Sequence, residues 1–232
     1  MGSKRTVSKY NLDILSNVGF DTFEMPILKA ERAIPTQLTG FNYALSKSEH
    51  NSFIHFYLDD YQFERVWNSP KKYVELFKKF DGIFTPDFSL YKDMPLPIQI
   101  YNVYRSRVLG RYYQDLGIKV IPTVSWSDEK SFDFCFEGLP THSIVTVSTV
   151  GIMNNKFNKE MFIKGFNEMI ERIDPREVLI YGKSIDVDFD RIEYFENKNI
   201  GRMTKQWVGE VQAVERVAVE EVQDLRHPVF LR

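Results

Sequence analysis

Short apolar runs that alternate with helical segments constrain the fold of this 232-residue chain more than any other feature. The runs are rich in β-branched and aromatic residues and occupy 53–58, 83–84, 118–124, 143–147 and 178–181. Segments with apolar residues at helical spacing separate several of them, at 73–80, 97–116 and 158–170. This order predicts an α/β fold of alternating βα units around a mainly parallel sheet. Five runs are fewer than the eight strands of a closed βα barrel, so an open doubly wound sheet and an incomplete TIM-like barrel both remain open.

The alternating core is expected to span residues 51–200, between two segments of different character. Residues 1–50 have weak periodicity, and Pro26, Pro35 and Gly40 indicate turns, so we expect an irregular N-terminal wrap. Residues 201–232 predict an amphipathic helix and a tail, with an apolar stripe among acidic residues formed by Val208, Val211, Val214, Val219, Val222 and Leu225. This helix is expected to dock on its own domain or, through residues 203–226, to form a homodimer or bind a partner.

The composition excludes several classes of protein. The 19 Phe, 12 Tyr and 3 Trp can fill a core, and the net charge of −2 disfavours a domain built for nucleic-acid backbones. A single cysteine, Cys135, excludes an internal disulfide and a multi-cysteine metal site. Neither a secretory signal nor a membrane-spanning run is found, which predicts a cytoplasmic protein without a membrane partner.

The common motifs of catalysis and nucleotide binding are missing. The glycines never form Gly-x-Gly, the histidines never form His-x-x-x-His, and no Gly-x-Ser-x-Gly occurs. Gly182-Lys183-Ser184 resembles the end of a P-loop, but Glu177 stands where the first glycine is required. The sequence therefore carries no motif that names a reaction.

Polar side chains at the ends of the predicted strands form the candidate site. In parallel α/β folds, ligands bind beyond the carboxyl ends of the strands. Carboxylates there could divide acid and base roles or bind a divalent metal ion. The candidate catalytic residues are Asp59, Asp60, Asp87 and Asp128. The candidate ligand-binding residues are Tyr91, Ser125, Trp126 and Arg105. Aspartate and serine after strands are also ordinary helix caps and turn formers, and this alternative stays open.

Two blocks of sequence resemble a known family. They are Phe80-Asp81-Gly82-Ile83-Phe84-Thr85-Pro86-Asp87-Phe88-Ser89-Leu90-Tyr91 and Ile118-Lys119-Val120-Ile121-Pro122-Thr123-Val124-Ser125-Trp126-Ser127-Asp128. They resemble the uncharacterised family catalogued as domain of unknown function 4417, found in bacteria, phages and mobile elements. The likeness runs from about Phe53 to Tyr181. It implies a cytosolic, phage-associated protein and transfers neither an activity nor catalytic residues.

Two hypotheses for function follow from these observations. The first is an enzyme-like domain with a carboxylate-lined site at the strand ends, acting by hydrolysis or group transfer on a sugar- or phosphate-containing substrate such as a nucleotide. The alternative is a non-catalytic accessory protein of a mobile element that dimerises or binds a host factor through its C-terminal helix. Nucleic-acid binding is the weakest reading, because the chain has an acidic balance.

Overall fold

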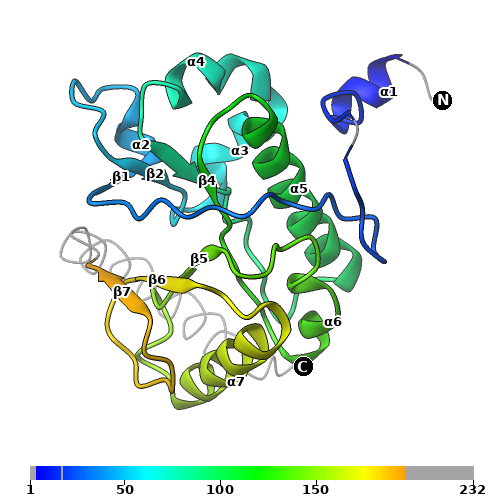
Figure 1. Ribbon diagram of the computed structural model, residues 1–232. Coiled ribbons are helices and arrows are strands. Elements are labelled where there is room, and N and C mark those ends of the chain that lie inside the picture. Colours follow the sequence, from blue (N-terminus) through cyan, green and yellow to red (C-terminus); the bar gives the residue numbers. More distant parts are fainter. Residues whose placement is uncertain (1–3, 17, 197–232) are drawn as a thin grey trace, which may run out of the picture. The chain divides into compact units, whose positions relative to one another are not determined.

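The computed structural model describes residues 4–16 and 18–196 (Figure 1). Within these residues the strands are β1 (Leu38–Gly40), β2 (Phe53–His55), β3 (Gly82–Phe84), β4 (Val120–Ile121), β5 (Ile144–Ser148), β6 (Glu177–Tyr181) and β7 (Ile192–Phe195). The helices are α1 (Lys4–Lys9), α2 (Phe41–Ala44), α3 (Asp60–Asn68), α4 (Val74–Phe77), α5 (Leu96–Asp115), α6 (Phe132–Cys135) and α7 (Lys156–Ile173). Two short 3₁₀ turns are η1 (Pro70–Tyr73) and η2 (Glu129–Ser131).

The strands form two parallel sheets in chain order, β1-β2-β3-β4 and β5-β6-β7. An isolated parallel bridge between Thr123 and Thr146 joins the segment after β4 to β5. The amide of Val124 donates to the Thr146 carbonyl at 2.8 Å, and the Thr146 amide donates to the Pro122 carbonyl at 2.9 Å. The described strands therefore follow one another in space as they do in sequence, which confirms the predicted α/β fold with parallel strands.

Side chains alternate between the two faces of each strand, as the pleat of a strand requires. One face packs against helices: Ile54 and Ile83 join a cluster with α3, α4 and α5, and Val145 and Val178 join a cluster with α6 and α7. The opposite face of both sheets meets in a single smaller cluster. Each described strand contributes to it, through Leu38, Phe53, Phe84, Ile121, Ile144, Leu179 and Phe195.

An extended N-terminal segment, residues 27–37, crosses the strands in blue in Figure 1. Its backbone bonds to distant parts of the chain: the Leu28 amide donates to the Gly138 carbonyl, and the Ile144 amide donates to the Glu31 carbonyl, both at 2.9 Å. Glu31 is thereby held at the amino end of β5. Together with the Phe53 amide, which donates to the Gln37 carbonyl at 3.0 Å, this places the segment at the amino ends of β2 and β5, opposite to the ends where the candidate site was expected.

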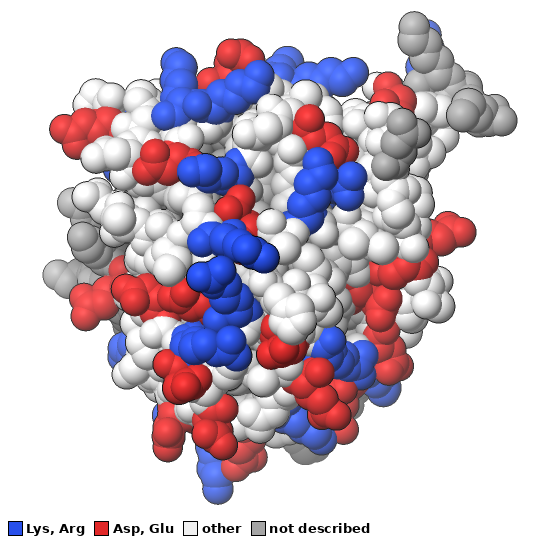
Figure 2. All heavy atoms as spheres, viewed as in Figure 1, with Lys and Arg blue, Asp and Glu red and all other residues white. Residues whose placement is uncertain are grey.

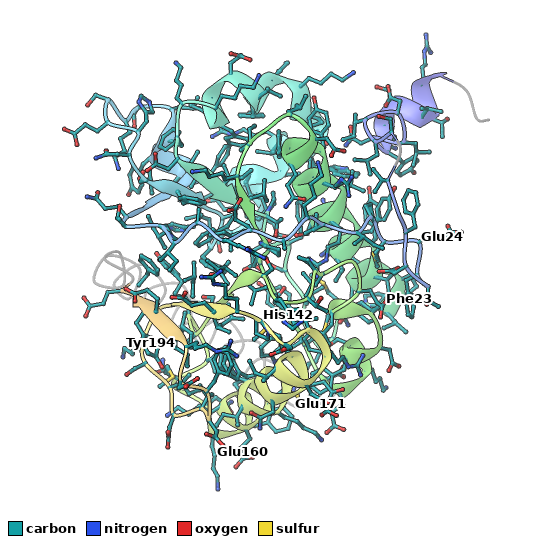
Figure 3. The ribbon with its side chains drawn as sticks, in the orientation of Figure 1. Phe23, Glu24, His142, Glu160, Glu171 and Tyr194 are labelled. Atoms are coloured by element: carbon teal, nitrogen blue, oxygen red, sulfur yellow. The ribbon has the colours of Figure 1, made fainter. Side chains whose placement is uncertain are left out.

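Several predicted elements have different bounds in the structure. The strands β1 and β7 were not predicted, and β1 lies within the expected N-terminal wrap. Helix α7 begins two residues before the predicted segment at 158–170, because Asn155 is its cap: the side chain of Asn155 accepts from the Asn158 amide at 3.2 Å. The alternation of Phe132, Phe134 and Phe136 in the sequence also fits a strand, but the structure has helix α6 from Phe132 to Cys135. Tyr194 of β7, labelled in Figure 3, is anchored through its hydroxyl to the Ile185 carbonyl at 3.2 Å.

Candidate functional site

Asp87 lies three residues beyond β3, in a small polar pocket at the carboxyl ends of the strands. The pocket lies between this edge and helix α5, and it has room for about one water molecule. Residues from four segments line it, among them Asp87, Asn102, Ser106, Arg107, Ser125 and Cys135. Burial raises the pKa of the Cys135 thiol, so the pocket offers no thiolate nucleophile near neutral pH.

Burial raises the pKa of Asp87 from 3.8 to about 7. The negative charge of Asp60 contributes to this increase, and a hydrogen bond from the Ser125 hydroxyl opposes it. A carboxyl group with a pKa near 7 can both give and take a proton at physiological pH. Of the candidate residues, the structure thus brings together Asp60, Asp87 and Ser125.

Asp60 has a bonding role of its own. Its carboxylate accepts from the Ser89 hydroxyl at 2.8 Å and from the Ser89 amide at 3.2 Å. These bonds tie the first turn of α3 to the segment that follows Asp87. Its neighbour Asp59 stands at the cap position of α3, is exposed, and makes no capping bond with its side chain.

Arg105 is committed to a network within the fold. Its Nη1 donates to both carboxylate oxygens of Glu64 at 2.8 Å, and its Nη2 donates to Asn102 Oδ1 at 2.6 Å. Its guanidinium lies 3.8 Å from the centroid of the Phe88 ring. Asn102, which lines the pocket, donates in turn to the Ser89 carbonyl at 2.7 Å. Arg105 therefore supports the pocket wall through Asn102 instead of offering a free cation.

Arg107, the arginine of α5 that lines the pocket, also uses its donors within the protein. Its three nitrogens donate to the carbonyls of Glu137, Thr123 and Cys135, at 2.8, 3.3 and 2.8 Å. The residue is 2% exposed, and burial lowers its pKa to about 10, so it still carries its charge at pH 7. Its donors are used in holding the segment 123–137 to the helix.

The candidates that follow β4 have structural contacts. Trp126 packs against Phe136 and Phe162, and a Cβ placed on Gly165 would come within 2.3 Å of its indole. Asp128 caps η2, since its carboxylate accepts from the Lys130 amide at 3.1 Å. In the structure Asp128 is therefore an ordinary helix cap, the alternative that the sequence left open. Tyr91 is 59% exposed and stays a predicted ligand contact.

A polar layer on the inner face of the strands was missed by the sequence reasoning. It lies at their carboxyl ends and consists of His55, Tyr57, Thr146 and Tyr181. The Tyr57 and Tyr181 rings stack at 5.0 Å, and the His55 ring lies 4.5 Å from that of Tyr181. Burial, and then the charge of Asp87, raise the pKa of Tyr57 well above its usual value, so this layer is electrostatically coupled to the pocket. A histidine inside an apolar strand was the available signal for it.

The described residues contain no group of three or more His, Cys, Asp or Glu side chains that could hold a metal ion. None of their helices combines the length and apolar character that crossing a bilayer requires. On the face in Figure 2, basic and acidic side chains are interspersed. The predicted interaction helix at 203–226 lies outside the described residues.

Comparisons with known proteins connect the chain to phages. The model of a domain of unknown function, DUF4417, matches residues 19–198. The Gene 1 protein of Mycobacterium phage L5 is 38% identical over 190 residues, which cover 80% of this chain and 83% of that protein. The Gene 1 protein of Mycobacterium phage D29 is 36% identical over 181 residues, covering 77% of this chain and 64% of that protein. No solved structure matches significantly.

Proposed function

Because this chain belongs to the DUF4417 family, whose description names no activity, we propose a function from the geometry of its site: an enzyme in which Asp87 acts as the general acid on a sugar-type substrate. The observation that carries the proposal is the position of Asp87 in a polar pocket at the carboxyl ends of β3 and β4, bonded to Ser125 and beside Asp60. Two neighbouring carboxyl groups with different environments are typical of acid–base pairs.

The architecture supports this location. We propose that the strands form an incomplete βα barrel, since their order follows the sequence and every described strand contributes a side chain to one inner cluster. A doubly wound sheet instead reverses its strand order at a switch point. In barrels of this kind, catalytic residues stand at the carboxyl ends of the strands. Asp87 has that position.

The proposed step is hydrolysis of a glycosidic bond. The leaving atom, which is the glycosidic oxygen or, in a nucleoside, a nitrogen of the base, takes the proton of the Asp87 carboxyl group as its bond to the sugar carbon breaks. Water adds its hydroxide to the carbon and returns its other proton to Asp87, so the enzyme ends as it began. A phosphate-directed reaction has less support, because the donors of Arg105 and Arg107 already bind protein oxygens.

The test compares two aspartates that follow neighbouring strands. The full chain is incubated with nucleosides and with p-nitrophenyl glycosides, and released base, sugar or nitrophenol is measured. We expect turnover that falls as the pH rises through about 7 and drops at least about 100-fold in Asp87→Asn. The control, Asp128→Asn, should stay within about twofold. Equal losses in both variants, or turnover unaffected by Asp87→Asn, would contradict the proposal.

A further inference from the structure

The polar layer formed by His55, Tyr57, Thr146 and Tyr181 contains one unsatisfied group. The Tyr57 hydroxyl and Thr146 Oγ1 are 2.8 Å apart, and Thr146 Oγ1 donates to the Leu179 carbonyl at 3.0 Å. Since the single proton of Thr146 is used there, the Tyr57 hydroxyl is the donor in the first bond. His55 differs, because its Nδ1 is buried without a partner while 4% of the residue is exposed.

Two other side-chain atoms among the described residues are buried without partners, and both belong to groups that are bonded elsewhere. Asp21 accepts two backbone amides through Oδ1, and Arg105 donates through Nη1 and Nη2. A buried polar atom left unbonded costs on the order of 1–3 kcal/mol. A ligand or an ordered water that bonds His55 Nδ1 would remove this cost.

The charge of the surroundings selects the ligand. Burial lowers the pKa of His55 to about 4, so at pH 7 the neutral ring offers one donor and one acceptor. The pKa of Asp87, about 7, shows that negative charge is also disfavoured next to this layer. The rings of His55, Tyr57 and Tyr181 pack against one another, so the surroundings of His55 are aromatic and offer no positive charge to a phosphate. An uncharged hydroxylated ring therefore fits better than a phosphate.

We propose that His55 is a substrate-binding residue whose Nδ1 bonds a hydroxyl group of an uncharged sugar or nucleoside entering at the strand ends beside Asp87. His55 is 4% exposed and the Tyr181 ring lies 4.5 Å from its ring, so the proposal requires the Tyr181 side chain to move aside when the ligand hydroxyl group binds. The inference rests on the proposed function for the claim that the same ligand reaches Asp87, and the binding itself requires no proton transfer.

The experiment observes the histidine rings directly. The full chain, labelled with ¹⁵N-histidine, is titrated at pH 7 with ribose, adenosine and AMP, and the ring-nitrogen resonances are followed by NMR. His55 is assigned from His55→Gln. His142, which is exposed and labelled in Figure 3, serves as the internal reference. We expect ribose or adenosine to shift the His55 Nδ1 resonance saturably, with His142 unchanged and AMP no tighter than adenosine.

The variants separate this inference from the proposed function. His55→Gln should weaken binding of adenosine about tenfold by calorimetry, while His142→Gln leaves it unchanged. The His55 shift should persist in Asp87→Asn. If no probe moves the His55 resonance, or AMP alone does, the inference is wrong. If Asp87-dependent turnover exists without a His55 shift, the inference fails and the proposed function stands. If the His55 resonance shifts but no Asp87-dependent turnover exists, the inference stands and the proposed function fails.

Discussion

After β3 the chain places Asp87 in a pocket with Ser125, whereas after β4 it places Asp128 at the start of η2, where its carboxylate accepts from the Lys130 amide. Both aspartates follow strands at the same edge of one parallel sheet. The pKa of Asp87 is raised by burial and by Asp60. The side chain of Asp128 satisfies a backbone donor, as a helix cap does.

Position at a strand end is therefore a weak criterion for a functional site. A better criterion is whether the side chain still has a hydrogen-bonding or ionisable group that no contact within the protein uses. Trp126 and Arg105 fail this criterion, because the first packs in the cluster of α6 and α7 and the second is bound by Glu64 and Asn102. Asp87 and His55 meet it.

Asp87→Asn should give the largest effect on the pH dependence of stability. The native pKa of Asp87 lies above that of the unfolded chain, so the native state holds its proton more tightly and loses stability as the pH rises from about 4 to 7. The asparagine variant lacks this loss. Relative to wild type it should gain up to about 4 kcal/mol between pH 4 and pH 8, measured by urea unfolding. A difference that does not depend on pH would contradict the assigned environment.

Trp126→Ala should cost about 3 kcal/mol at every pH, because it leaves a cavity against Phe136 and Phe162. Urea unfolding of this variant tests whether Trp126 contributes packing, in contrast to Asp87, which contributes an ionisable group. The control Tyr91→Ala, at an exposed position, should stay within about 0.5 kcal/mol of wild type. A changed pKa of Asp87 in Trp126→Ala would contradict this separation, because it would show that Trp126 affects the environment of Asp87.

His55→Phe should show the opposite pH trend to Asp87→Asn. The native pKa of His55, about 4, lies below the unfolded value of 6.5, so the wild type loses stability as the pH falls from 6.5 to 4. Relative to wild type, the variant should gain about 3 kcal/mol over that interval. Unfolding at pH 8 serves as the reference. A constant difference from pH 8 to pH 4 would mean that His55 ionises freely in the native state.

Asp128→Ala should give the smallest effect, a loss of about 1 kcal/mol from the missing cap of η2. Asp128→Asn keeps an acceptor oxygen and should lose less. Thermal melting of both variants measures this order. A loss of ligand binding in either would assign Asp128 to the site and remove the contrast with Asp87.

The sequence predicted the strands that carry long apolar runs, because burial on both faces requires such runs. It missed β1, whose Leu38-Thr39-Gly40 has no apolar pattern, and β7, where Glu193 and Tyr194 interrupt the apolar residues. Short edge strands of this kind depend on pairing with a neighbour more than on their own composition.

The candidate site was predicted in part for a similar reason. Asp60, Asp87 and Ser125 could be grouped from strand ends alone, whereas the cap at Asp128 depends on which backbone amide folds back toward it. His55 was missed because only the sheet register decides that it faces inward with Tyr57 and Tyr181, while Ile54 and Phe56 face the helices.

The ionisation of Asp87 distinguishes a general acid in a buried pocket from an ordinary surface carboxylate. Titration of the side-chain carboxyl ¹³C resonance by NMR, assigned from Asp87→Asn, gives its pKa in the full chain. We predict a midpoint of about 7, and a lower value in Asp60→Asn, since the charge of Asp60 contributes to the shift. A midpoint near 4 would show Asp87 to be an ordinary solvated carboxylate and would contradict the proposed site.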